Sequence, residues 1–409
     1  MEEIKKIIVS IHLGGNEMEV GELISEGRKI YFKYYTSFVK SGLEISPFKL
    51  KLSEKIYSAD ATPFEGLFGV FADSLPDGWG RLLLDRTLTA RGVLIQDVMP
   101  LQRLSYVGTR GMGALIYRPE IDSFSKKEIQ LELDSIAKEM NTVIEGSSYD
   151  AIEELYQLGG SSGGARPKIL VGYNSKSDKL MHGEDKLPKG YEHWLIKFQS
   201  SMDRKDNANI EFAYYKMVLD AGIEMSESKL FTGKSGNVYF GTKRFDREGE
   251  KRFHMHSAAG LMHDDFRLSN LDYGHLMDCA FKLEKHVGAY EKILRLAAFN
   301  VFAQNRDDHS KNFSFLMDET GQWKLAPAYD LTFSNSSHGF HSTMVSGESK
   351  NPGKIQLLKL ANYFKIKKAN EIIQQVEAVV SNWKTYAKQA GVEKESCNLI
   401  NKKILGHID

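Results

Sequence analysis

Eight residues in the last third of the chain, NRDDHSKN at positions 305–312, combine side chains that can do chemistry. They include two adjacent carboxylates, a histidine, a lysine and an asparagine, and the apolar stretch FSFLM follows directly. A charged surface loop between a helix and a strand would have the same composition. The oxygen ligands and the cation are also those that a site for metal and phosphate requires. The elements around this run decide between the two interpretations.

The residues that follow predict a β-hairpin. FSFLM and QWKLA flank DETG, a four-residue turn that ends on glycine, so the chain should reverse there and pair antiparallel. If Met317 pairs with Gln322, Asn312 lies opposite Pro327, and Asp330 comes three residues later. We therefore expect Asn312 and Asp330 to emerge close together at the open end of the hairpin.

Asp307 precedes Asn312 by five residues, and a loop of that length can place its carboxylate near the same pocket. The order Asp, Asn, hairpin, Asp is the one that protein kinases use. There the first Asp orients the attacking hydroxyl, and the Asn and the second Asp bind magnesium. The Asp-to-Asn spacing alone is common, but the hairpin and the trailing Asp330 give it weight. We predict Asp307 as catalytic and Asn312 and Asp330 as Mg²⁺ ligands.

A phosphoryl-transfer site also needs cations and a backbone cradle for phosphates, and the middle of the chain offers both. The segment GGSSGGARPK (159–168), which includes Gly163 and Gly164, can bend tightly and present N–H groups to phosphate. It is not a Walker A motif, because Gly-Lys-Ser/Thr is absent and Pro167 precedes Lys168. A plain glycine-rich surface loop is the alternative.

Three further residues are candidates for the nucleotide side of the site. Lys197 lies mid-strand in HWLIKF, where a buried lysine needs an anionic partner, although an edge strand would let it point outward. Glu211, fourteen residues later on the next predicted helix, is a candidate partner or else a solvated residue of the helix face. Phe245 in TKRFDR is a candidate to pack on adenine, with a core aromatic as the alternative.

Composition limits the class of protein. The 409 residues are 42% hydrophobic and 26% charged, which is globular and long enough for two or three domain-sized units. Lys+Arg and Asp+Glu are equal at 54 each, so any contact with DNA should come through a partner. The two cysteines, far apart, exclude a disulfide framework and a zinc ribbon. With no secretory segment or long apolar stretch, we expect a soluble, unexported, cytoplasmic protein.

The pattern of elements predicts an α+β chain in three parts. Alternating segments such as KIYFKYY and GALIYRP, with a helix around WGRLLLDRTLTARG, make residues 1–125 an α+β module. A charged helical connector, KKEIQLELDSIAKEM, opens residues 126–250, which hold the glycine-rich segment, the strands ILVGY, EHWLIKFQS and NVYFGTKRFDRE, and a helix ending at Gly222. Residues 251–409 are mainly helical apart from the hairpin.

These motifs, taken in order, resemble the HipA family of serine/threonine kinases, the toxin halves of bacterial type II toxin–antitoxin modules. The matching segments lie between residues 65 and 331 and are SLPDGWGR, YVGTRGMGALIYRP, SSGGARPK, IKF, KRFDR, NRDDHSKNFS and PAYDL. The resemblance implies a bilobal, protein-kinase-like α+β fold with an extra N-terminal subdomain and a mainly helical C-terminal lobe. It also implies ATP and Mg²⁺ as cosubstrates and a small helix-turn-helix antitoxin, HipB-like, as DNA-binding partner. Family members studied as toxins phosphorylate aminoacyl-tRNA synthetases.

The resemblance also assigns roles to single residues. It matches Asp307 to the catalytic Asp, and Asn312 and Asp330 to the magnesium ligands. It matches Lys197 to the lysine that binds the ATP phosphates, and Lys168 to the lysine that ends the glycine loop.

Further matches concern the two loops. His309 matches a histidine that shapes the catalytic loop, and Ser161 occupies the position of the serine whose autophosphorylation expels the glycine loop from the ATP pocket. Two departures are present. Ser162 stands where an apolar residue is common, which leaves open whether Ser161 or Ser162 is the residue that would be phosphorylated, and Lys243 replaces an acidic residue found in some members.

Two other functions stay open. A metal-dependent nuclease could be built on DDHSKN, because a His-Asn pair beside carboxylates can bind magnesium and activate water, but it leaves Lys197 and the glycine loop unexplained. A non-catalytic HipA-like scaffold, acting as corepressor with a DNA-binding antitoxin, would have no need of Asp307, Asn312 and Asp330.

Overall fold

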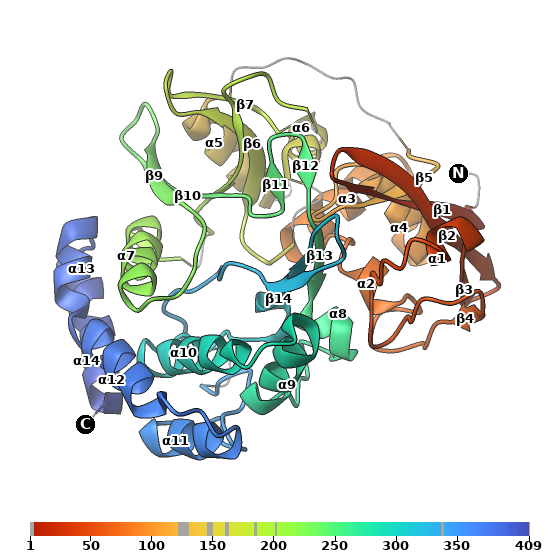
Figure 1. Cartoon of the computed structure of the whole chain (residues 1–409). Helices are drawn as coiled ribbons and strands as arrows, with labels where there is room; N and C mark the ends of the chain where they lie inside the picture. Colours follow the sequence, from red (N-terminus) through yellow and green to blue (C-terminus); the bar gives the residue numbers. More distant parts are fainter. Residues whose placement is uncertain are drawn as a thin grey trace. The chain divides into compact units, whose positions relative to one another are not determined.

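A computed structural model of the chain describes residues 4–121, 131–144, 150–159, 163–183, 186–200, 203–336 and 339–408. Figure 1 labels its helices and strands, and the contacts within the chain divide it into two compact units. Unit 1 consists of Met1–Asp203, Phe231–His256 and Leu316–Gly321, and unit 2 of Arg204–Leu230, Ser257–Phe315 and Gln322–Asp409.

Unit 1 begins with an antiparallel five-stranded sheet of order β4-β3-β2-β1-β5. Ile7, Val9 and Ile11 of β1, which pairs with β2 on one side and β5 on the other, are fully buried, as expected for a strand with one face on a core. Its strands are β1 (Lys6–Leu13), β2 (Asn16–Glu26), β3 (Lys29–Tyr34), β4 (Ile56–Ser58) and β5 (Leu115–Arg118). The helices of this region are α1 (Thr36–Val39), α2 (Gly69–Ala72), α3 (Gly78–Ala90), η1 (Ile95–Asp97) and α4 (Pro100–Val107).

A second sheet of unit 1 has the order β7-β6-β8-β10-β9. Ile169 and Ile196 from adjacent strands pack in one core with Met140, Leu155 and Leu83 of three helices, so α3, α5 and α6 share the face of this sheet. Its strands are β6 (Lys168–Asn174), β7 (Lys179–His182), β8 (Glu192–Lys197), β9 (Ser228–Thr232) and β10 (Val238–Lys243). The two helices that follow the first region are α5 (Leu133–Ile144) and α6 (Asp150–Gly159).

A buried ion cluster ties the second sheet to the first region of unit 1. Asp246 is 0% exposed and accepts hydrogen bonds from Arg244 Nε (2.9 Å), Arg247 Nη1 (2.7 Å) and the Gly113 amide (2.7 Å). Arg247 also donates to the carbonyl oxygens of Gly111 and Gly113, at 3.1 and 2.6 Å. Burial alone would raise the pKa of Asp246, but the charges of Arg244 and Arg247 outweigh it and hold the pKa well below its ordinary value. The remaining strands of this part are β11 (Arg247–Glu248), β12 (Lys251–Arg252) and β13 (His254–Ser257).

Unit 2 is mainly helical. Its central helix, α10, packs against α9, α11, α12 and α14 and buries Leu294, Ala298 and Val301 completely. Its helices are α7 (Asn207–Asp220), α8 (Ala258–Met262), α9 (Tyr273–Glu284), α10 (Gly288–Phe302), η2 (Ser310–Asn312), α11 (Lys354–Tyr363), α12 (Ala369–Ser381), α13 (Trp383–Ala390) and α14 (Lys394–Ile408). The hairpin strands are β14 (Ser314–Met317), whose last two residues belong to unit 1, and β15 (Trp323–Leu325).

The hairpin is present, but its pairing is displaced from the predicted register. The Ala326 amide donates to the Ser314 carbonyl at 2.9 Å, whereas the predicted register placed Leu325 opposite Ser314. The predicted connector helix begins only at Leu133, and residues 126–130 lie outside the described residues. The strand predicted over residues 237–248 ends at Lys243, because Arg244 and Asp246 turn into the ion cluster. The three-part division at residues 125 and 250 stays a prediction.

Within the described part of the chain, no helix combines the length and apolar character that a membrane crossing requires.

Replacing Asp246 by Asn should strongly destabilise the protein, because two buried guanidinium groups would lose their carboxylate. Breaking a buried ion pair from one side costs about 3–5 kcal/mol. Urea unfolding of the purified variant measures the loss. The control is Glu192→Gln, which removes the partner of Lys243 in a half-exposed ion pair of the kind worth about 0–1 kcal/mol. Equal losses in the two variants would contradict the role of the cluster.

Candidate functional site

The loop that carries the predicted catalytic residue starts where α10 ends. The Asn305 amide bonds back to the Asn300 carbonyl at 3.0 Å, and the side chains of the two residues are also joined at 3.0 Å, which closes the helix. Asn312 Nδ2 donates to the Asp307 carbonyl at 2.7 Å, so both ends of the DxxxxN segment are held together. His309 Nε2 lies 4.0 Å from Asp307 Oδ1. The structure thus gathers Asp307, His309 and Asn312 in one loop.

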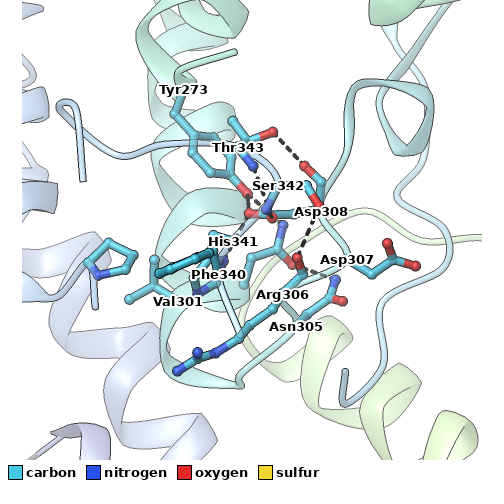
Figure 2. A network of polar contacts seen from close by, with 12 residues as sticks. Tyr273, Val301, Asn305, Arg306, Asp307, Asp308, Phe340, His341, Ser342 and Thr343 are labelled. Atoms are coloured by element: carbon cyan, nitrogen blue, oxygen red, sulfur yellow. Dashed lines mark hydrogen bonds and ion pairs between the residues drawn. The ribbon is translucent and has the colours of Figure 1, made fainter. Parts of the chain in front are cut away.

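A dense set of hydrogen bonds holds the neighbouring carboxylate, Asp308 (Figure 2). Asp308 is 1% exposed; its Oδ2 accepts from the Tyr273 hydroxyl at 2.9 Å and lies 3.1 Å from His341 Nδ1. Its Oδ1 accepts from the amides of Ser342 (2.8 Å) and Thr343 (3.2 Å), while the Thr343 hydroxyl donates to the Asp308 carbonyl at 2.5 Å. Burial and, after it, the Asp308 charge raise the pKa of Tyr273, so the phenol remains a donor.

The two adjacent aspartates therefore do different things. The side chain of Asp307 is 61% exposed, and in Figure 2 its carboxylate points away from the network around Asp308. Asp308 is structural, since its oxygens are used by donors from α9 and from residues 341–343. Asp307 is the carboxylate of the pair that a substrate hydroxyl can reach.

Asp330 comes from the segment after the hairpin, which returns to the same loop. The hydroxyl of Tyr329 donates to the Lys311 carbonyl at 2.6 Å and lies 2.6 Å from Ser314 Oγ. Its neighbour Asp330 is half-buried and has φ 52°, a left-handed backbone that is uncommon outside glycine and concentrates at functional sites. The Tyr329 side chain thus links the segment that carries Asp330 to the residue before Asn312, and the approach of Asn312 to Asp330 stays a prediction.

Among the described residues, no group of three or more His, Cys, Asp and Glu side chains lies close enough together to hold a metal ion by itself. A magnesium site of the predicted kind is smaller than that, because one carboxylate and one amide oxygen share the ion with substrate phosphates and water. Asn312 fits this role: its Nδ2 is engaged with the Asp307 carbonyl, which leaves Oδ1 as the side-chain oxygen for a ligand.

The predicted nucleotide lysines belong to unit 1 and lie side by side. Lys168 of β6 and Phe240 of β10 are the Cα partners of Lys197 on β8, one on each side. Residues directly opposite on antiparallel strands point to the same face of a sheet. Ile169 and Ile196 belong to the helix-covered core, so both lysines project from the other face. Like charges at such positions repel, and an anion bound beside both would offset the repulsion.

Apolar side chains adjoin these lysines on the same face. Leu170 is the partner of Leu195, and Leu195 of Thr242, two residues along each strand from the lysine row. Phosphates on the cations and a base on this apolar strip would fit a nucleotide. Phe245 follows β10 half-exposed between the buried Arg244 and Asp246, and its contact with adenine stays a prediction.

The glycine segment is described from Gly163 onward, and its serines, including the predicted autophosphorylation residue Ser161, lie outside the described residues. Lys168 is buried and donates from Nζ to the Gly163 carbonyl at 2.5 Å. Glu211 is buried on α7, and its pairing with Lys197 stays a prediction. Asp307, His309, Asn312 and Asp330 belong to unit 2 and the nucleotide candidates to unit 1, so assembly of one site stays a prediction as well.

A second polar cluster was not anticipated from the sequence. His256 Nε2 lies 3.1 Å from Ser46 Oγ, and its Nδ1 lies 2.6 Å from Asp73 Oδ2, which is the connectivity of a Ser-His-Asp triad. Ser46 is 1% exposed and His256 is fully buried, so no substrate can reach the hydroxyl. The cluster joins three segments of unit 1 that are distant in sequence, and its role is structural.

Comparison with known proteins identifies the family. The family models of the HipA-like C-terminal domain and the HipA N-terminal domain match residues 160–383 and 11–118. The serine/threonine-protein kinase toxin HipA of Shewanella oneidensis is 23% identical over 406 residues, covering 89% of this chain and 84% of the relative. The solved complex of HipA, HipB and operator DNA from the same organism contains a chain that matches with a TM-score of 0.68 at 17% identity, covering 98% of this chain and 96% of that one.

The C-terminal family model alone spans more than half of the sequence, so the chain belongs to the HipA family. The structural match confirms the predicted fold class, a two-domain α+β fold of the HipA type.

Substitutions of the two adjacent aspartates should separate their roles in stability. Asp308→Asn should lower the free energy of unfolding by about 3 kcal/mol or more, since a buried carboxylate with several donors would be lost. Asp307→Asn should leave stability within about 0.5 kcal/mol, because its side chain is mostly exposed. Thermal and urea unfolding of both variants measure this. A larger loss for Asp307→Asn would contradict the assignment.

Proposed function

We propose that the protein is an ATP- and Mg²⁺-dependent serine/threonine protein kinase of the HipA toxin type. The observation that carries the proposal is the catalytic loop, in which a buried Asp308 fixes the backbone while Asp307 is exposed and bonded through its carbonyl to Asn312. The paired lysines on one face of the second sheet add the cations that phosphates need. The relative from Shewanella oneidensis is named a kinase, which agrees with this reading.

In this proposal the protein contributes position and charge. Asp307 accepts the proton of the acceptor hydroxyl as the oxygen attacks the γ-phosphorus, and the bond from phosphorus to the ADP oxygen breaks. Lys168 and Lys197 hold the nucleotide phosphates and balance their charge. Asn312 and Asp330 would hold Mg²⁺, whose positive charge stabilises the charge that develops on the phosphate oxygens.

The proposal extends to partners and to the substrate. The matching solved chain was determined with HipB and operator DNA, and we propose a HipB-like antitoxin as the partner through which this chain reaches DNA. Its equal numbers of basic and acidic residues, 54 each, agree with an indirect contact. We propose a translation-related protein such as an aminoacyl-tRNA synthetase as substrate, and Ser161 as the site of autophosphorylation. Phosphoproteomics after induced expression, against an Asp307→Ala control, tests the substrate.

Magnesium-dependent ATP binding tests the site itself. Loss of even an outer-shell partner weakens metal affinity by about 10–100-fold, so Asn312→Ala and Asp330→Ala should each weaken ATP binding in magnesium at least about tenfold. Without magnesium the two variants should match the wild type. Calorimetric titration of the full chain, with Asp278→Ala as control for an exposed aspartate of α9, measures both arms.

Each alternative function gives its own result in this titration. A scaffold predicts that the wild type binds no ATP at all. A nuclease predicts magnesium binding that Asn312→Ala and Asp330→Ala weaken without any dependence on ATP. An unchanged magnesium dependence in both variants would rule the pair out as ligands.

A further inference from the structure

The glycine segment is hydrogen-bonded to a motif of the N-terminal region that has no role in the phosphate transfer proposed above. This motif, SLPDGWGR (74–81), leads into α3. The amide of Gly164 donates to Asp77 Oδ1, and the carbonyl of Gly164 accepts from the Trp79 amide at 3.0 Å. Both polar groups of one residue of the glycine segment are therefore fixed by residues 87 and 85 positions earlier (164 − 77 and 164 − 79).

The close approach of the two segments requires glycine at position 78. A Cβ on Gly78, where φ is +45°, would lie 2.5 Å from the Gly164 oxygen and 2.6 Å from the Ala165 Cα. A Cβ on Gly163 would lie 3.1 Å from Asp77 Oδ1. The distances at Gly78 would force the two backbones apart, whereas the distance at Gly163 would require only a small shift of the Asp77 side chain.

The side chain of Asp77 does not cap its own helix. Asp77 is the N-cap residue of α3, a position where an aspartate normally accepts from the second or third helical amide. Here the side chain makes no cap hydrogen bond and accepts from Gly164 instead. The side chain at the N-cap of α3 therefore binds the glycine segment and not its own helix.

The C-terminal end of the segment is held separately, within the second sheet region. Arg166 forms an ion pair with Asp203 at 3.1 Å, and the Phe198 amide donates to the Pro167 carbonyl at 2.8 Å. Lys168 also contacts Gly163 within the segment. Asp77 and Trp79 of the N-terminal region, in contrast, bind the middle of the segment at Gly164.

We propose that Asp77 is a positioning residue for nucleotide binding, which makes the N-terminal region part of the kinase machinery. The inference rests on the proposed kinase function. Glycine loses more conformational freedom than any other residue when it is ordered. A glycine loop that Asp77 already holds binds phosphate at a lower entropic cost than a free loop. Because the Gly164 amide is engaged with Asp77, Lys168 rather than this amide binds the phosphates.

Nucleotide affinity and loop exchange, measured on the full chain, test this inference. In calorimetry with ATP and magnesium, Asp77→Ala should weaken binding about tenfold, as expected for a lost hydrogen bond to a charged group. Asp77→Asn should retain most of the affinity, since its Oδ1 can still accept from Gly164. In kinetics KM for ATP should rise while kcat changes little, because Asp307 is untouched. Glu65→Ala is the matched control, as it removes a carboxylate paired with Arg81 at the same end of α3.

Hydrogen exchange of the nucleotide-free protein provides a readout without ATP. The peptide that contains Gly164 should exchange faster in Asp77→Ala than in the wild type, Asp77→Asn or Glu65→Ala. Unchanged exchange in Asp77→Ala, or ATP binding that is unchanged or tighter, would overturn the inference alone, provided that the wild type binds ATP. A wild type that binds no ATP would overturn the proposed function and the inference with it.

Discussion

The burial of Asp308 is the constraint on which the proposed chemistry depends. A carboxylate taken out of water is costly unless donors surround it, and here a phenol, two amides and an imidazole nitrogen contact its two oxygens. Those groups come from α9 and from residues 341–343. The segment that follows the hairpin therefore has to return to the loop that carries Asp308. Once the backbone at position 308 is fixed, the side chain at 307 is left outside, beside Asn312 and His309.

The positions of the two candidate lysines follow from the pairing of β-strands rather than from the burial of a charge. Antiparallel pairing brings Lys168 and Lys197 to the same face of the second sheet. The alternate residues, such as Ile169 and Ile196, point to the opposite face and pack in the core under the helices. The ion cluster of Asp246 and the hold of Asp77 on Gly164 both connect this sheet to the N-terminal region. Unit 1 therefore combines the N-terminal region with the strands that carry Lys168 and Lys197, the candidate nucleotide lysines.

Sequence reasoning succeeded where the signal is local. The hairpin, the helix ending near Gly222 and the strands around Lys168 and Lys197 follow from periodicity and turn residues, and the structure contains them. Sequence reasoning did not anticipate contacts between residues that are far apart in the chain. His341 lies 33 residues from Asp308 in the sequence, and Gly164 lies 87 residues from Asp77. Contacts at such sequence separations produce no periodicity or turn signal that could predict them. The hairpin register differed because the pairing of strands depends on packing as well as on the turn.

One measurement tests the central claim most directly: the transfer of labelled γ-phosphate from ATP to protein by the wild type and by Asp307→Asn, with ATP affinity determined on the same samples. A positioned base contributes about 10²–10⁴-fold to a rate. The account predicts that Asp307→Asn loses transfer on that scale while it binds ATP and Mg²⁺ as the wild type does. Transfer by Asp307→Asn at the wild-type rate would contradict it.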